Sequence, residues 1–495
     1  MNASDPRRWW ALGALAVALL AFGLDVTVLS VALPTLAVDL HASTSQLQWF
    51  SNAYTLVLAA GLLPAGLLGD RFGPKRLLLG ALALFGLASV ACAYSGSAAL
   101  LIASRALLGV GGAFLVPMSV SVLSVLFPGK DRARAIAVWA AAMALGIPLG
   151  PVVGGWLLDN FWWGSAFLVN VPFIVVGMAL LARLLPDIPG NPRQRIDFPG
   201  IVLSSLGLVA LTYGLVEAGD RGWGSGRSLV PIFAGVVLLA AFAGRLGRAR
   251  DPLVDPKLFA SNGFRWGAVL ATLASFALMG AMFVLPQYFQ AVFGTDALGT
   301  GLRLLPVVGG LLAGVQIADR IRPRLGAKVV VGFGFVLLAV GLGVGAGTGV
   351  GTGYGFVAVW VSLVGLGLGF SLPPAMDIAL GALSPARSGV GSGLLQALRQ
   401  VGGTLGVAIL GTVLNAGYRG ALPAGTPDAA RESAAAGVRV PGLAEAAQRA
   451  FVHGMSGTLW VCMAFSVLGA ALTVAFLPRA AEDVEAESGH EFVAG

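Results

Sequence analysis

The stretch ALLAFGLDVTVLSVALP, residues 18–34, is an apolar run with a single carboxylate, Asp25, inside it. The run begins near Trp9 and ends at Pro34. It can therefore cross the roughly 30 Å hydrocarbon core of a bilayer as one helix, which needs about 20 residues. A charged side chain at the centre of such a helix costs about 2.5–3.5 kcal/mol and usually faces a cavity or a partner. Asp25 therefore either has a functional role or forms one half of a static ion pair that only holds helices together.

The composition is that of an integral membrane protein. Of the 495 residues, 57% are hydrophobic and 11% are charged, whereas soluble domains carry about 25% charged residues. The net charge of +8 comes from basic residues in short loops between apolar runs, which indicates membrane orientation and not a nucleic-acid partner. Cys92 and Cys462 both lie in apolar runs, so no disulfide framework is expected.

Apolar runs of sufficient length predict fourteen membrane spans. They cover residues 10–33, 49–69, 76–95, 98–126, 134–158, 163–185, 199–218, 229–246, 264–290, 300–318, 327–347, 354–380, 388–416 and 455–477. With the N-terminus inside, 22 of the 31 Lys and Arg residues fall on the inner side and six on the outer side. This asymmetry predicts that both termini are cytoplasmic.

Three pairs of segments repeat along the chain at nearly constant spacing. GDRFGPKR (69–76) resembles ADRIRPRLGAK (318–328), with a spacing of 249 residues. Gly112–Pro117 and Gly369–Pro374 are 257 residues apart, and Gly146 and Gly402 are 256 apart. The spacing always equals eight spans, which predicts two six-helix repeats with two inserted helices and a substrate path between the repeats.

The repeats divide the chain into four predicted parts. They are a six-helix bundle (1–185), two inserted linker helices with cytoplasmic connections (186–263), a second six-helix bundle with a long outer loop at 417–454 (264–478), and an acidic disordered tail (479–495). The outer loop is polar and rich in alanine, which favours short surface helices. The predicted fold class is therefore all-α, with 14 transmembrane helices.

Asp25 and Arg105 are predicted to lie at similar depth in the membrane. Asp25 is fifteen residues from the start of the first span and Arg105 seven from the start of the fourth, which runs the opposite way. At about 1.5 Å per residue both fall in the outer half of the core. Burial raises the pKa of a carboxyl group and a nearby arginine lowers it, so the pair predicts a proton site, with a static ion pair as the alternative.

The fifth span contains LGIPLGPVVGG (145–155). Its glycines 146, 150 and 154 share one face and let a neighbouring backbone approach closely. The prolines 148 and 151 remove backbone donors and bend the helix. The pattern fits a helix with a role in transport and ordinary close helix packing equally well.

Several motifs taken together resemble the major facilitator superfamily, and within it the fourteen-span drug:proton antiporters. They are GLLGDRFGPKR (66–76), RALLGVGGA (105–113), GIPLGPVVGG (146–155), LDVTVLSVALP (24–34), FLVNVPF (167–173), DFPG (197–200), YFQAVFG (288–294) and LRQVGGTLGVAILGTV (398–413). The resemblance covers nearly the whole chain up to the acidic tail. It implies proton-coupled export of hydrophobic compounds, cationic ones included, by alternating access.

The resemblance also assigns roles to individual residues. Asp25 and Arg105 correspond to the proton-coupling pair. The inner gate corresponds to Gly66, Asp70, Arg71, Gly73 and Arg76, with Asp319 and Arg320 in the second repeat, and the antiporter motif to Gly146, Gly150, Pro151, Gly154 and Gly155. Two departures from the family pattern, Ser30 in place of Asn and Leu108 in place of Gln, face the expected cavity.

For several other residues the sequence allows two possible roles. A substrate cavity is predicted from Phe22, Ser30, Leu108, Met143, Tyr288, Gln290 and Asp377, although lipid-facing or packing roles are the alternative for the apolar ones. Asp377, which follows a proline interruption at 373–374, either binds a cation or meets cytoplasmic water. Glu217 and Asp220 fit a solvated outer edge better than a transport role.

Two rival functions remain at this stage. The first is a proton-coupled symporter, or an exporter of lipid or metabolite, with the same fold. The second, a membrane enzyme or sensor, is disfavoured because three histidines form no metal-spaced cluster and no nucleophile motif is present. We therefore expect no enzymatic activity, metal or cofactor, the proton motive force as energy source, a small hydrophobic substrate, and a functional monomer in the inner membrane.

Overall fold

The computed structural model describes residues 6–42, 44–127, 131–191, 197–246, 257–383, 388–427, 430–431, 434–438 and 440–477. A few side chains inside these segments, those of Ser30 and Pro151 among them, lie outside the described part. The predicted acidic tail 479–495 lies outside it entirely. All regular secondary structure within the described segments is helical.

The N-terminal half follows the predicted spans closely. Its helices are α1 (Arg7–Asp39), α2 (Thr44–Phe72), α3 (Pro74–Ala93), α4 (Ala98–Leu126), α5 (Asp131–Asn160), α6 (Ser165–Leu168) and α7 (Asn170–Leu184). Local signals set the helix ends: the Ser97 hydroxyl accepts a hydrogen bond from the Leu100 backbone N–H at 3.3 Å and so caps α4.

The inserted pair and the C-terminal half complete the chain. The inserted helices are α8 (Phe198–Arg221) and α9 (Gly226–Leu246). They are followed by α10 (Lys257–Ala260), α11 (Asn262–Ala291), α12 (Ala297–Leu325), α13 (Ala327–Ala346), α14 (Tyr354–Gly381), α15 (Ser388–Ala421), α17 (Ala434–Gly437) and α18 (Ala444–Phe476). Asp197 caps α8 by accepting from the Gly200 N–H at 3.1 Å.

The length and apolar character of these helices confirm the predicted class of fold. Among the described residues, thirteen helical segments are long and apolar enough to span a membrane. The remaining predicted span, 134–158, lies within the 30-residue helix α5, several side chains of which are outside the described part. At about 1.5 Å per residue α5 is also long enough to cross a bilayer.

The predicted span 163–185 corresponds to one candidate span, Ser165–Leu184, which contains α6 and α7. Two other predicted details need correction. The helix α14 continues through Pro373 and Pro374 to Gly381, so these prolines do not interrupt it. The outer loop is shorter than predicted, since α15 extends to Ala421 and α18 begins at Ala444.

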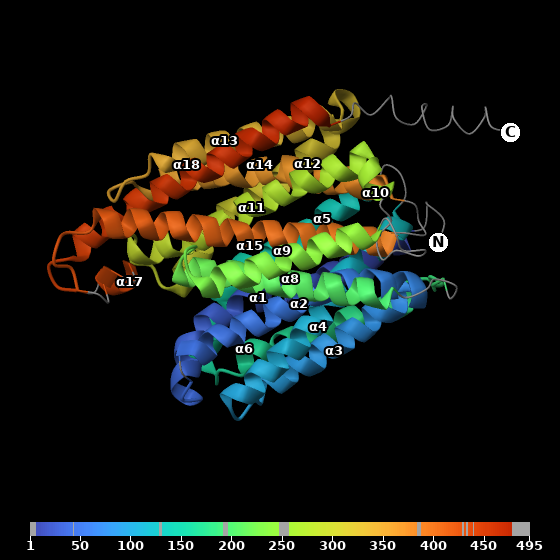
Figure 1. Ribbon diagram of the computed structural model, residues 1–495, viewed down its shortest axis with the longest axis horizontal. Helices are drawn as coiled ribbons and strands as arrows, with labels where there is room; N and C mark the ends of the chain where they lie inside the picture. The colour runs from blue at the N-terminus through green and yellow to red at the C-terminus, as the bar shows by residue number, and fades with distance from the viewer. Residues whose placement is uncertain are drawn as a thin grey trace.

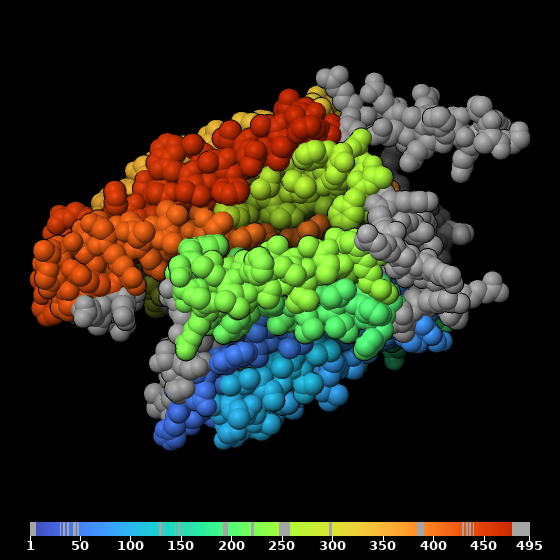
Figure 2. All heavy atoms as spheres, viewed as in Figure 1, coloured from blue at the N-terminus to red at the C-terminus, as the bar shows by residue number. Residues whose placement is uncertain are grey.

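Figure 1 shows that α1 begins and α18 ends at the same end of the molecule, which we call the terminal side. The two halves meet where α2 and α4 contact α15, and where α5 contacts α12 and α14. The helix α8 packs on α9, on α2 of the first half and on α15 of the second. In Figure 2 the green α8 and α9 accordingly lie between the blue N-terminal half and the orange C-terminal half.

The repeated glycines occupy equivalent packing positions in the two halves. A Cβ atom on Gly146 of α5 would lie 2.6 Å from the Gly23 Cα of α1. A Cβ atom on Gly402 of α15 would lie 2.8 Å from the Thr272 carbonyl oxygen of α11. In each half the glycines therefore bring the fifth helix of the repeat against its first helix at backbone distance.

Candidate functional site

The structure brings Asp25 of α1 and Arg105 of α4 together in a buried ion pair. Arg105 Nη1 donates a hydrogen bond to Asp25 Oδ2 at 2.7 Å. The side chain of Asp25 is 0% exposed and that of Arg105 is 2% exposed, so the pair is shielded from both lipid and water in this conformation. A buried pair of this kind needs further hydrogen bonds to offset the loss of hydration.

Residues from two other helices, α2 and α7, supply those further contacts. Asn170 Nδ2 of α7 donates to Asp25 Oδ1 at 3.2 Å. The Phe50 carbonyl of α2 accepts from Arg105 Nε at 2.9 Å. The guanidinium also lies 4.6 Å from the ring centroid of Tyr54, a favourable cation–π distance. Both carboxylate oxygens and two of the guanidinium nitrogens are thus engaged.

No sequence motif assigns a role to Asn170, Phe50 or Tyr54. The motif FLVNVPF (167–173) contributes to the family resemblance, yet its asparagine is the one polar side chain in an apolar run. That pattern is the signal that identifies Asn170 as a partner for a membrane charge. Phe50 acts through its backbone carbonyl, and no side-chain pattern reveals such a contact.

The glycine face of α5 holds the segment of α1 around Asp25. A Cβ atom on Gly150 would meet the Thr27 hydroxyl, and one on Gly154 would lie 2.7 Å from Val28 Cγ2. Together with Gly146 against Gly23, these contacts flank Asp25 on both sides. The geometry shows close packing by Gly146, Gly150 and Gly154. For Gly155 it shows only partial exposure, and the Pro151 side chain is outside the described part.

The predicted inner gate of the first repeat lies on the terminal side. A Cβ atom on Gly393 of α15 would lie 3.6 Å from the Gly66 Cα, so the two halves touch there. Gly73 has φ +93° and packs against the Ile188 carbonyl, and the Asp70 carbonyl accepts from the Asn191 N–H at 2.8 Å. The predicted gate motif therefore contacts the connection that follows α7.

The charged members of that motif lie around the same connection. The Arg71 guanidinium lies 5.5 Å from the ring centroid of Phe72. Lys75 Nζ donates to Asp187 Oδ1 at 2.8 Å, and this hydrogen bond lowers the pKa of the exposed Asp187 carboxyl. The positive charge of Arg76 lowers that pKa further.

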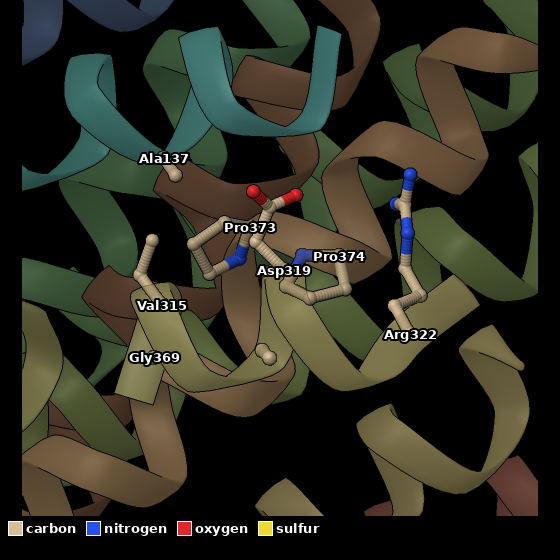
Figure 3. Close-up of a pocket in the computed structure, with 8 residues that line it drawn as sticks. Ala137, Val315, Asp319, Arg322, Gly369, Pro373 and Pro374 are labelled. Atoms are coloured by element: carbon tan, nitrogen blue, oxygen red, sulfur yellow. The ribbon is translucent and has the colours of Figure 1, made fainter. Parts of the chain in front are cut away.

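Asp319, one of the two residues of the predicted second gate, lines a small pocket between the two halves (Figure 3). Asp319 and Arg322 of α12 line it together with Ala137, Val315, Ala318, Gly369, Pro373 and Pro374. Arg322 Nη1 also donates to Asp377 Oδ2 at 2.6 Å, so Asp377 is ion-paired on the terminal side. Arg320 points outward and is exposed.

The residues predicted to line a substrate cavity do not come together in this conformation. Phe22 and Leu108 are buried in the first half, where Phe22 packs on Tyr54 and Phe85. Tyr288 is fully buried in the second half. The remaining members differ in environment: Met143 and Asp377 are partly exposed, Gln290 is exposed, and the Ser30 side chain is outside the described part.

A second arginine within a span, Arg399 of α15, lies where the halves meet and is partly exposed. Its Nε donates to Ser275 Oγ at 3.0 Å and its Nη1 to Gln396 Oε1 at 2.9 Å. The guanidinium lies 5.9 Å from the ring centroid of Trp139 in α5. Within the described residues no three His, Cys, Asp or Glu side chains are grouped to hold a metal ion.

Two helical bundles of the same internal plan, with charged side chains buried at membrane depth and a shared interface, define a membrane transporter. Residues 15–407 match the sequence profile of the Major Facilitator Superfamily, and the chain belongs to that family. The predicted resemblance is thereby confirmed. A multi-pass transporter of this family is not an enzyme, in agreement with the sequence analysis.

Two relatives are similar over almost the whole chain. The tetracenomycin C resistance and export protein of Streptomyces glaucescens is 33% identical, over 97% of this chain and 93% of that protein. The multidrug efflux pump LfrA of Mycolicibacterium smegmatis is 35% identical, over 94% and 96%. The structure of the proton:xylose symporter XylE has the same fold, with a TM-score of 0.64 and 15% identity over 95% of this chain and 96% of that one.

Proposed function

We propose that this protein exports small hydrophobic drugs or natural products across the cytoplasmic membrane in exchange for protons, by alternating access. The observation that carries the proposal is the fully buried Asp25 carboxylate, held by Arg105 and Asn170 in the outer half of the predicted membrane core. The names of the two relatives, one an export protein and one an efflux pump, support the direction of transport.

In the proposed cycle, the proton that enters from outside binds Asp25. A neutral carboxyl group interacts more weakly with the Arg105 guanidinium, because the charge-assisted hydrogen bond is roughly twice as strong as a neutral one. Arg105 keeps its contacts with the Phe50 carbonyl and the Tyr54 ring, so α4 is held to α2 while its hold on α1 is released. Deprotonation toward the cytoplasm restores the pair.

Contacts between the halves indicate which state the structure represents. Ser392 Oγ donates to the Pro117 carbonyl at 3.3 Å, and Gly393 packs on the Leu62 carbonyl. Residues of α5, α12 and α14 line the pocket in Figure 3 together. These contacts lie toward the terminal side. With the termini in the cytoplasm, we infer a state that is closed inside, in which the next step is opening of this interface.

The proton motive force is sufficient for this work without any cofactor. One charge moved through 100 mV is worth about 2.3 kcal/mol. At about 1.4 kcal/mol per decade this supports a concentration gradient of roughly fiftyfold. One protonatable group, such as Asp25 in a monomer, is therefore enough to drive a useful substrate gradient.

The test uses everted membrane vesicles that contain the full-length protein, with ethidium and fluorescein as a cationic and an anionic aromatic probe. We expect uptake of at least one probe when the vesicles are energised, and its collapse when a proton uncoupler is added. Asp25→Asn should remove the uptake, and Asp39→Asn, an exposed acid on the same helix, should not. Uptake that survives the uncoupler would refute proton coupling.

The fold alone does not set the direction of transport, because XylE is a symporter with the same architecture. The same vesicles separate the two functions. A proton-coupled exporter moves its probe into everted vesicles while protons flow out of them. A symporter moves probe and protons in the same direction. Gradient-driven loss of preloaded probe from everted vesicles would establish the symporter instead.

A further inference from the structure

Arg399 is a cation at membrane depth that has no anionic partner among the residues that the structure describes. It lies eleven residues after the start of α15, or about 16 Å along the helix axis, near the middle of a core of roughly 30 Å. Its two hydrogen-bond partners, Ser275 and Gln396, are neutral. Among the described residues, Asp25 pairs with Arg105 and Asp377 pairs with Arg322, and Arg399 forms no ion pair.

The neighbouring amide provides a second donor that lacks an acceptor. Gln396 is 7% exposed, and its Nε2 atom has no hydrogen-bond partner among the described residues. Its Oε1 atom, on the same amide, accepts from Arg399, so the free donor lies next to the guanidinium. Buried polar groups in proteins nearly always have partners. A hydrogen-bond acceptor is therefore missing beside Gln396 and Arg399 among the described residues.

Hydrogen bonds hold the Arg399 guanidinium in place, but its side chain remains partly accessible. Arg399 is partly exposed, whereas its neighbours Ser275 and Trp139 are buried. The Trp139 ring is fixed because its Nε1 donates to Ser119 Oγ at 2.8 Å. Since Trp139 belongs to the first half and Ser275 to the second, Arg399 faces the interface between them. A ligand that reaches this interface would therefore meet the guanidinium, whereas the Trp139 ring beside it is fully buried.

We propose that Arg399 and Gln396 bind an ionised acidic group (a carboxylate, phenolate or enolate) of an aromatic or otherwise apolar substrate at the interface between the halves. The planar fork of an arginine suits such groups, because it donates two parallel hydrogen bonds. An unpaired charge in a membrane interior marks a functional site. As a site for the exported compound, this inference rests on the proposed function, and it favours an anionic substrate over a cationic one.

The test measures binding and not transport. Full-length protein in lipid nanodiscs is titrated against fluorescein, and binding is followed by fluorescence polarisation. We expect Arg399→Gln to weaken fluorescein binding by roughly tenfold to a hundredfold, because hydrogen bonds to charged groups are of this strength. Arg399→Lys should retain part of the affinity. Arg303→Gln removes a cation from the same half, at a site against Phe293 and Tyr354, and should leave the affinity unchanged.

Gln396→Glu provides a variant that keeps the site folded. It places a carboxylate beside Arg399, so the guanidinium gains an internal partner and fluorescein binding should be lost. Equal fluorescein affinity in the wild type and in either Arg399→Gln or Gln396→Glu would overturn the inference, as would a wild type that binds ethidium but not fluorescein. Loss of proton dependence in the vesicle assay would refute the proposed function while leaving Arg399-dependent binding in place.

Discussion

The α1–α5 pair of the first half and the α11–α15 pair of the second half are built alike but carry different charges. In both, glycines of the later helix pack on the backbone of the earlier one: Gly146 on Gly23, and Gly402 on Thr272. Thr272 follows Gly23 by 249 residues, the spacing already found between the gate motifs. The scaffold is thus repeated at the level of helix contacts.

The charged residues are not repeated. At the spacing of 249 residues, the position of Asp25 is taken by Ala274, which is fully buried. At the spacing of 256 residues, the position of Arg399 in the first half is taken by Met143. The first half therefore contains a closed, neutral ion pair, and the second an open cation. We interpret this difference in charge as a difference in function: the first half binds the proton and the second half binds the substrate.

The largest expected effect is that of Asp25→Asn on coupled transport. The amide cannot ionise, so probe transport driven by a proton gradient should fall to the background level, while exchange of probe across de-energised membranes persists. The yield of inserted protein, checked by size-exclusion chromatography, should match the wild type. Full coupled transport by this variant would make Asp25 a packing residue and remove the difference between the halves.

The next effect concerns stability. Arg105→Gln leaves the buried Asp25 carboxylate without its counter-charge and should destabilise the protein by about 3–5 kcal/mol. The double variant with Asp25→Asn should recover most of this loss, because neither charge is then buried alone. Thermal unfolding of the purified variants provides the comparison, and simple additivity of the two single changes would contradict a coupled pair.

A matched pair of glycine variants tests the repeated scaffold. A Cβ atom at Gly150 would meet the Thr27 hydroxyl, and one at Gly406 would lie 2.5 Å from the Phe276 carbonyl oxygen. Gly150→Ala and Gly406→Ala should therefore each cost about 1–3 kcal/mol through overpacking. Only Gly150→Ala, which displaces α1 next to Asp25, should shift the pH dependence of transport. Equal shifts in both variants would refute the division between the halves.

The smallest effect is that of the surface pair Lys75–Asp187. The hydrogen bond from Lys75 lowers the pKa of Asp187, so its stabilising contribution is present above the unfolded value of about 3.9. That contribution disappears as the pH falls through the lower pKa of the folded state. The difference in melting temperature between wild type and Asp187→Asn should accordingly be small at neutral pH and vanish in acid. A difference that grows in acid would contradict this pairing.

The sequence predicts the architecture well because membrane spans have a strong and simple signal. Hydrophobic length places every span. The predicted ends differ from the helix ends by at most seven residues, except that α18 begins eleven residues earlier than predicted. The similar depth of Asp25 and Arg105 follows from helix rise alone, and the structure shows the two in contact. Helix ends that project beyond the bilayer lack this signal, which is why the extension of α18 to Ala444 is not predicted.

Packing details are less accessible to sequence reasoning. Whether Leu108 or Tyr288 faces a cavity depends on the rotation of each helix and on the conformational state, and both side chains are buried here. Arg399 stands in a quoted motif, yet its neutral surroundings come from Ser275, 124 residues away in the chain. The sequence shows that a charge lies in a span, but only the structure shows whether that charge has a partner.

The most direct test of the account follows the ionisation of Asp25 itself. Infrared difference spectra of the full-length protein in proteoliposomes, recorded between acidic and alkaline pH, detect the protonated form of a buried carboxyl group. We predict a protonated-carboxyl band in the wild type that is missing from Asp25→Asn and retained in Asp39→Asn. Identical difference spectra for the wild type and Asp25→Asn would show that this carboxyl group does not exchange a proton, and would contradict the proposed mechanism.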